Sequence, residues 1–109
     1  SLMQPAAEVL QKALAEIKFN PPRLDVINNV DVAIESDIAR IREALVRQAW
    51  HPVRWVETIN KMCAMGVTHI VECGPGKVLQ GLVKRIAPQV QNLALTDMPS
   101  LLQIKGLLQ

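Results

Sequence analysis

The sequence has few cysteine, histidine and tyrosine residues, whose side chains often act as nucleophiles, acids, bases or metal ligands. Its 109 residues include two cysteines, two histidines and no tyrosine. Cys63 and Cys73 stand singly rather than in C-x₂-C pairs, which excludes a disulfide scaffold and makes a reducing cytoplasm the expected compartment. His51 and His69 have no partner at the spacing of zinc ligands. We therefore expect no metal.

The sequence also lacks the marks of several classes of partner and of the common catalytic sets. Twelve Lys and Arg against ten Asp and Glu give a net charge of +2, which does not indicate nucleic-acid binding. No apolar run approaches the roughly 18 residues of a membrane span. A G-x-S-x-G elbow is missing, and no histidine is paired in sequence with a nucleophile. We expect neither nucleic acid nor a membrane as partner, and no complete catalytic set within these residues.

What the sequence does contain is an alternation of helical and extended patterns. Apolar residues at helical spacing predict helices at 3–17, 37–49, 52–65, 77–86 and 99–108. Short apolar or β-branched runs predict strands at 24–28, 67–73 and 92–96. Because helices between short strands favour crossover connections, we predict an α/β fold with these strands parallel in one sheet.

Local signals predict where several helices begin and end. Either Ser36 or Asp37 can cap the second helix with its side-chain oxygen. Pro52 suits the first position of the third helix, where a missing N–H costs nothing. Gly66 suits the position just beyond that helix, where a left-handed backbone is common.

The most distinctive run is Gly74-Pro75-Gly76-Lys77, between a predicted strand and a predicted helix. Its backbone N–H groups could bind an anion at the helix start, or the run could be a plain turn in which glycine supplies a positive φ. A nucleotide-binding P-loop is excluded, because Val78 stands where a metal-binding hydroxyl is needed. The residues alone favour the plain turn. Its place at the carboxyl end of a strand keeps Gly74, Gly76 and Lys77 as candidates near a site.

Two polar residues outside this turn are further candidates. Asn29 follows the first predicted strand and suits either turn chemistry or the lining of a site. Gln48 falls at an inward-facing helical position, so its amide needs a partner or exposure near the helix end. Basic residues on two helices are typical of solvated faces, with an acidic partner as the alternative; they are Arg40, Arg42, Arg47, Lys77, Lys84 and Arg85.

Four motifs occur in a particular order: SLM at 1–3, NNVD at 28–31, LVRQxxHPVxW at 45–55 and ExGPGKVLxGL at 72–82. In this order and spacing they resemble the carboxyl-terminal part of the bacterial malonyl-CoA:acyl carrier protein transacylases of type II fatty-acid synthesis. The resemblance extends over essentially all 109 residues and over about the last third of the family's chain. It implies that residues 1–109 are the closing segment of an α/β-hydrolase-like core, without a second domain.

The resemblance also implies a reaction and its participants. Malonyl would pass from coenzyme A to an active-site serine and then to the phosphopantetheine thiol of acyl carrier protein, with no cofactor. The serine, the oxyanion-hole residues, the arginine for the malonyl carboxylate and the histidine base would all lie in a preceding part of the chain. That missing N-terminal part, malonyl-CoA and acyl carrier protein are the expected partners. The 109 residues alone are expected to be inactive.

Within the sequence, the resemblance assigns one catalytic role. The backbone carbonyl of Gln48 would orient the absent histidine, and neither His51 nor His69 matches that histidine's position. Asn29 and the turn at 74–77 would lie beside the substrate site. Since neighbouring strands are expected upstream, we also expect Val26, Ile27, Ile70 and Val71 to be poorly buried or to face a partner chain.

Two alternative functions stay open. One is a non-enzymatic α/β module that binds an acidic carrier protein through its basic helix faces. The other is the acyltransferase domain of a modular synthase. The turn at 74–77 favours the stand-alone bacterial enzyme.

Overall fold

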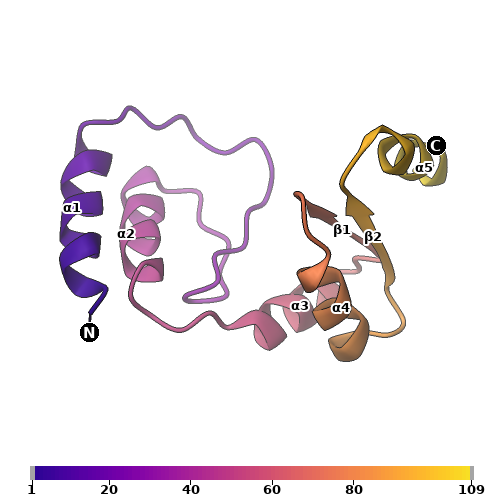
Figure 1. The fold of residues 1–109 in the computed structure, drawn as a ribbon. Coiled ribbons are helices and arrows are strands. Elements are labelled where there is room, and N and C mark those ends of the chain that lie inside the picture. The colour runs from indigo at the N-terminus through magenta and orange to yellow at the C-terminus, as the bar shows by residue number, and fades with distance from the viewer. Residues whose placement is uncertain (1, 109) are drawn as a thin grey trace. The chain divides into compact units, whose positions relative to one another are not determined.

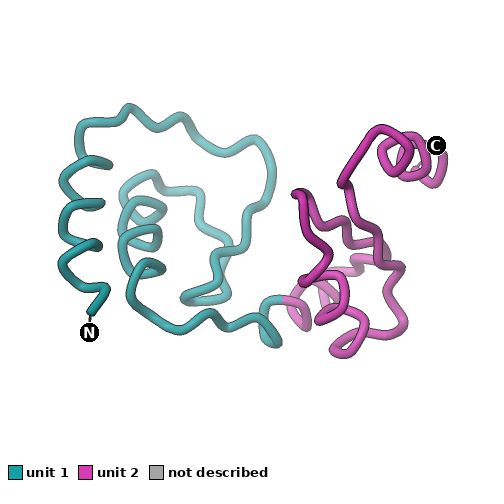
Figure 2. Tube along the Cα trace, viewed as in Figure 1, with its two compact units in different colours: residues 1–58 teal, residues 59–109 magenta. Residues whose placement is uncertain are grey.

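The computed structural model describes residues 2–108, so that Ser1 of the first motif lies outside the described residues. The chain forms two compact units, 1–58 and 59–109, which are coloured separately in Figure 2. Figure 1 labels the elements: α1 (Gln4–Ala15), α2 (Ile38–Gln48), α3 (Trp55–Ala64), β1 (His69–Cys73), α4 (Val78–Ile86), β2 (Gln91–Leu95) and α5 (Met98–Leu107).

The first unit is built on the packing of α1 against α2, which lie side by side in Figure 1. Ala7 and Leu14 of α1 and Ala44 of α2 are buried. The Arg42 guanidinium fastens the chain that leaves α1, because its Nη2 donates to the Ile17 carbonyl at 2.6 Å.

The predicted strand at 24–28 is wrong. In the described chain this segment makes one isolated antiparallel bridge, between Ile27 and Ile34. The Asn28 N–H donates to the Ala33 carbonyl at 3.0 Å, and the Asn28 Oδ1 accepts from the Asp31 N–H at 2.8 Å. The chain therefore turns back on itself before a longer ladder can form, since asparagine bonds the local backbone so readily.

Of the two predicted caps, Asp37 is the one that forms. Its Oδ1 accepts from the Ala39 N–H at 2.8 Å and from the Arg40 N–H at 3.3 Å, which satisfies two N–H groups of the first turn of α2. Ser36 is exposed and makes no such bond in the described structure.

The predicted start of the third helix at Pro52 is wrong, because α3 begins at Trp55. The Arg54 N–H donates to the Asn29 carbonyl at 3.0 Å, and the Arg54 carbonyl accepts the first helical bond, from the Thr58 N–H at 3.0 Å. This tertiary bond holds Arg54 at the entrance of the helix. Residues 51–53 therefore remain outside it.

The second unit opens with the end of α3, where Gly66 has the predicted left-handed backbone at φ +91°. The Gly66 N–H donates to the Cys63 carbonyl at 3.0 Å and the Val67 N–H to the Met62 carbonyl at 3.1 Å. These two bonds form the Schellman arrangement that ends many helices.

A parallel pair of strands, β1 and β2, forms the sheet of this unit, with His69 opposite Gln91 and Cys73 opposite Leu95. Helix α4 connects the two strands and packs on both, and α5 packs on β2. The buried side chains between them are Val83, Ala87, Val90, Leu93 and Ile104. The α/β class and the parallel pairing are confirmed, with two strands instead of three in the described chain.

The expectation of poor burial is confirmed for Val26 and only partly met by the other three side chains. Val26 is 63% exposed, and Ile27, Ile70 and Val71 are half-buried.

Replacing Asp37 by alanine is expected to destabilise the protein by about 1 kcal/mol, because the cap of α2 is lost. Urea unfolding measures the change. Ser36→Ala is the matched control, since it removes a neighbouring hydroxyl without touching the cap. Equal losses in the two variants would contradict the assignment of the cap.

Candidate functional site

The turn at 28–31 is fastened to the last turn of α2 by an ion pair. Arg47 donates from Nη1 to Asp31 Oδ1 and from Nη2 to Asp31 Oδ2, both at 2.7 Å. Such a two-bond arrangement fixes direction as well as distance. Arg47 also faces Glu43 one turn back, with Nε 3.6 Å from Oε1. The pair therefore brings together two motifs that are separate in the sequence.

Asn29 lies between the end of α2 and the start of α3. Its N–H donates to the side-chain Oε1 of Gln48 at 3.3 Å, and its carbonyl accepts from the Arg54 N–H at 3.0 Å. The sequence indicated that the side-chain amide of Gln48 needs a hydrogen-bond partner. The N–H of Asn29 in the neighbouring turn is that partner. The two candidates of this unit, Asn29 and Gln48, are in direct contact.

The last two backbone carbonyls of α2 differ in the number of hydrogen bonds that they accept. The Arg47 carbonyl accepts from the Trp50 N–H at 3.2 Å, the His51 N–H at 3.0 Å and His51 Nδ1 at 2.8 Å. In contrast, the Gln48 carbonyl accepts no backbone N–H from the described part of the chain. Because a carbonyl oxygen can only accept, His51 carries its proton on Nδ1, and its ring packs on Trp50 at a centroid distance of 4.0 Å.

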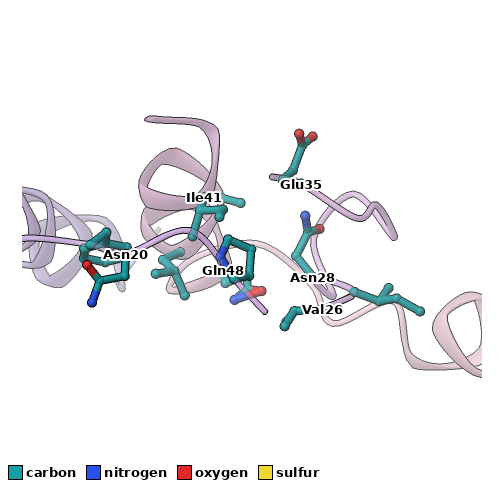
Figure 3. Close-up of a pocket in the computed structure, with 11 residues that line it drawn as sticks. Asn20, Val26, Asn28, Glu35, Ile41 and Gln48 are labelled. Atoms are coloured by element: carbon teal, nitrogen blue, oxygen red, sulfur yellow. The ribbon is translucent and has the colours of Figure 1, made fainter. Parts of the chain in front are cut away.

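A cavity of about 400 Å³ lies beside this helix end (Figure 3). Its lining is mostly apolar, with polar groups from Asn20, Asn28, Glu35 and Gln48. Figure 3 shows Gln48 in the middle of the lining, with Asn20 on one side and Asn28 and Val26 on the other. An apolar cavity with few polar groups is the usual form of a small-molecule site. No sequence pattern indicated Asn20 or Glu35, which are isolated polar residues in connecting segments.

The turn at 74–77 belongs to the second unit and follows β1. Gly74 has φ +149°, a backbone that favours glycine, and its N–H donates to the Leu95 carbonyl at 3.2 Å. Gly76 is exposed, and Lys77 occupies the N-cap position of α4 without a side-chain cap bond. These contacts are those of a turn fixed to the end of the sheet, as the residues alone favoured.

Glu72, one of the motif residues, supports the start of α4 from the preceding strand. Its Oε1 accepts from the Gln80 N–H at 2.8 Å. A carboxylate at the N-terminus of a helix is favourable both as an acceptor and for the helix dipole. Lys77, Lys84 and Arg85 are exposed along α4 and give it a basic edge.

The remaining chemistry-bearing residues form no cluster among residues 2–108. No group of three or more His, Cys, Asp or Glu side chains there could hold a metal ion. Cys63 and Cys73 are both free thiols. Among the same residues, no helix has the length and apolar character needed to cross a membrane.

Comparison with known sequences identifies what the chain is similar to. No protein-family model matches it. It is 50% identical over 100 residues to the malonyl CoA-acyl carrier protein transacylase of Haemophilus influenzae, which is 92% of this chain and 32% of the relative. The protein of the same name from Bacillus subtilis is 43% identical over 96 residues, which is 88% of this chain and 30% of the relative.

Solved structures agree in fold. An acyl carrier protein S-malonyltransferase from Vibrio cholerae matches with a TM-score of 0.90 and 50% identity, over 94% of this chain and 34% of that one. A malonyl-transacylase solved in complex with a type II PKS acyl-carrier protein matches with a TM-score of 0.91 and 47% identity, over 94% and 33%. The chain therefore spans about a third of the length of the relatives it matches, and the resemblance to these transacylases is confirmed.

The Asp31–Arg47 pair makes a prediction about titration. The Arg47 guanidinium lowers the pKa of Asp31, chiefly through the two hydrogen bonds and then through its charge. The stabilisation from the pair is therefore present above the ordinary pKa of the carboxyl group and is lost as the pH falls through the lowered value. In an NMR titration, Arg47→Gln should raise the Asp31 midpoint toward its ordinary value.

Glu43→Gln is the control for that titration, because it removes the other carboxylate near Arg47 and leaves both hydrogen bonds to Asp31 in place. An Asp31 midpoint that moves equally in both variants would show that the hydrogen bonds are not the cause.

Proposed function

We propose that this chain is the carboxyl-terminal segment of a bacterial enzyme that transfers malonyl from coenzyme A to acyl carrier protein in fatty-acid synthesis. Identity at half of the aligned positions to relatives named for that reaction is the observation that carries the proposal. In this proposal residues 1–109 form part of the large acyltransferase core, and the enzyme works in the cytoplasm without a cofactor.

The proposed reaction proceeds through two acyl transfers. A serine attacks the malonyl thioester, a histidine takes the serine proton, and the coenzyme A thiolate leaves; the phosphopantetheine thiol of the carrier then attacks the acyl-serine. The serine and the histidine belong to the part of the enzyme that precedes these residues. What this segment supplies is the acceptor that orients the histidine.

The Gln48 carbonyl is the acceptor we propose for that histidine. Its oxygen receives no backbone N–H from the described residues, and its residue lines the cavity. The nearby Asp31 carboxylate is already bound to both Nη atoms of Arg47. His51 is not the base in this proposal, because it does not match the position of the family's histidine in the sequence.

The other candidates act by position. Asn29 holds the Gln48 side chain and so helps to fix the helix end from which the carbonyl projects. Gly74, Gly76 and Lys77 form the turn beside which we propose that substrate binds. The exposed basic edge of α4, with Lys84 and Arg85, is the surface proposed to contact the acidic carrier protein.

The full-length enzyme that contains this segment is expected to transfer malonyl from coenzyme A to holo-acyl carrier protein, and the 109 residues alone are not. The segment lacks both nucleophile and base, so no acyl-enzyme can form. Radiolabelled malonyl-CoA and gel detection of labelled carrier measure both. Label on the carrier with the purified segment would contradict the assignment, and no label with the full-length enzyme would refute the proposed function.

Gln48→Ala in the full-length enzyme is expected to lower kcat/KM by less than about tenfold, since it removes one hydrogen bond to Asn29 and keeps the carbonyl. Gln48→Pro is expected to abolish most activity, because the ring displaces the last turn of α2 and its carbonyls. Steady-state kinetics, with circular dichroism to confirm folding, measure the difference. An alanine variant as inactive as one lacking the histidine would rule out the main-chain role.

A further inference from the structure

The Gln48 carbonyl has no backbone donor because of a residue four positions further along the chain. In an α-helix the carbonyl of one residue accepts from the N–H four residues later. For Gln48 that residue is Pro52, which has no N–H. The N–H one position earlier, that of His51, is already donated to the Arg47 carbonyl at 3.0 Å.

Pro52 also forces the helix to end where it does. The residue before a proline is disfavoured in the α conformation, so His51 does not extend α2, which ends at Gln48. The N–H and Nδ1 of His51 both turn back to the Arg47 carbonyl, at 3.0 and 2.8 Å. The Arg47 carbonyl therefore accepts from both Trp50 and His51, and the next carbonyl along, that of Gln48, accepts no backbone N–H from the described residues.

We infer that Pro52 is a positioning residue that keeps the Gln48 carbonyl available for the catalytic histidine. The inference rests on the proposed function. Any other residue at position 52 brings an N–H that competes for this carbonyl and permits the helix to continue by another residue. The histidine would then lose the acceptor that orients its ring and stabilises its protonated form.

The test compares full-length enzymes with proline and alanine at position 52. Pro52→Ala is expected to lower kcat/KM for malonyl-CoA by about 3- to 10-fold, the effect of one lost hydrogen bond. It is also expected to move the acid limb of the pH profile to lower pH. The direction follows because the carbonyl favours the charged imidazolium, so that losing it lowers the pKa of the histidine. If Pro52 served only to support the local fold, its replacement would lower kcat/KM and leave the pH of the acid limb unchanged.

Two controls separate the effect of the added backbone N–H at position 52 from the effect of removing the proline ring. The α-hydroxy analogue of alanine, introduced at position 52 by nonsense suppression, has the side chain of alanine without an N–H and should restore the acid limb. Pro88→Ala is the matched control, because Pro88 stands four residues after Lys84 of α4 as Pro52 does after Gln48 of α2. It should leave both the rate and the pH profile unchanged.

The inference is overturned if Pro52→Ala leaves the acid limb where it is in the unmodified enzyme. It is also overturned if the α-hydroxy variant behaves like the alanine variant, since the N–H would then have no part in the effect. A full-length enzyme that does not transfer malonyl at all would instead refute the proposed function, before any substitution is compared.

Discussion

The bidentate pair between Arg47 and Asp31 fixes the geometry on which the rest of the first unit depends. It ties the turn at 28–31 to the last turn of α2, with two equal bonds that set the angle between them. Both side chains are about one-third exposed, so the pair contributes more to geometry than to stability. With the turn in place, Asn29 reaches the Gln48 amide on one side and the Arg54 N–H on the other.

Sequence reasoning succeeded where a feature is decided by residues close along the chain. Asp37 caps α2 because its carboxylate needs only the next few N–H groups, and Gly66 ends α3 because no side chain opposes its left-handed backbone. The parallel pairing of β1 and β2 follows in the same way from the helix between them. The two helix ends are settled within a few residues, and the paired strands are joined by a single helix.

It failed where the outcome depended on which other segment of the chain a run of residues meets. The β-branched run at 24–28 fits a strand, but strand preference expresses packing against neighbouring strands, and in the described chain the one bridge of this run joins Ile27 to Ile34, just beyond its own turn. Pro52 suits a helix start, but the bond from Arg54 to Asn29 moves that start to Trp55. The contact of Asp31 with Arg47 has no periodic signal either, since the two residues belong to different motifs. The order of the motifs indicated that these segments lie near the site. It did not indicate which atoms of the segments are in contact.

When a site uses a main-chain atom, the amino acid that the site requires can stand at a different position from that atom. In the proposed mechanism the carbonyl at position 48 exists whatever side chain stands there, so the glutamine contributes through its bond to Asn29 and not through the reacting centre. The requirement for a free acceptor falls instead on position 52, where only proline lacks an N–H. In this mechanism position 52 therefore tolerates fewer amino acids than position 48, although the acceptor carbonyl belongs to residue 48. A search for catalytic side chains passes over both, because neither one does its work through a titratable group.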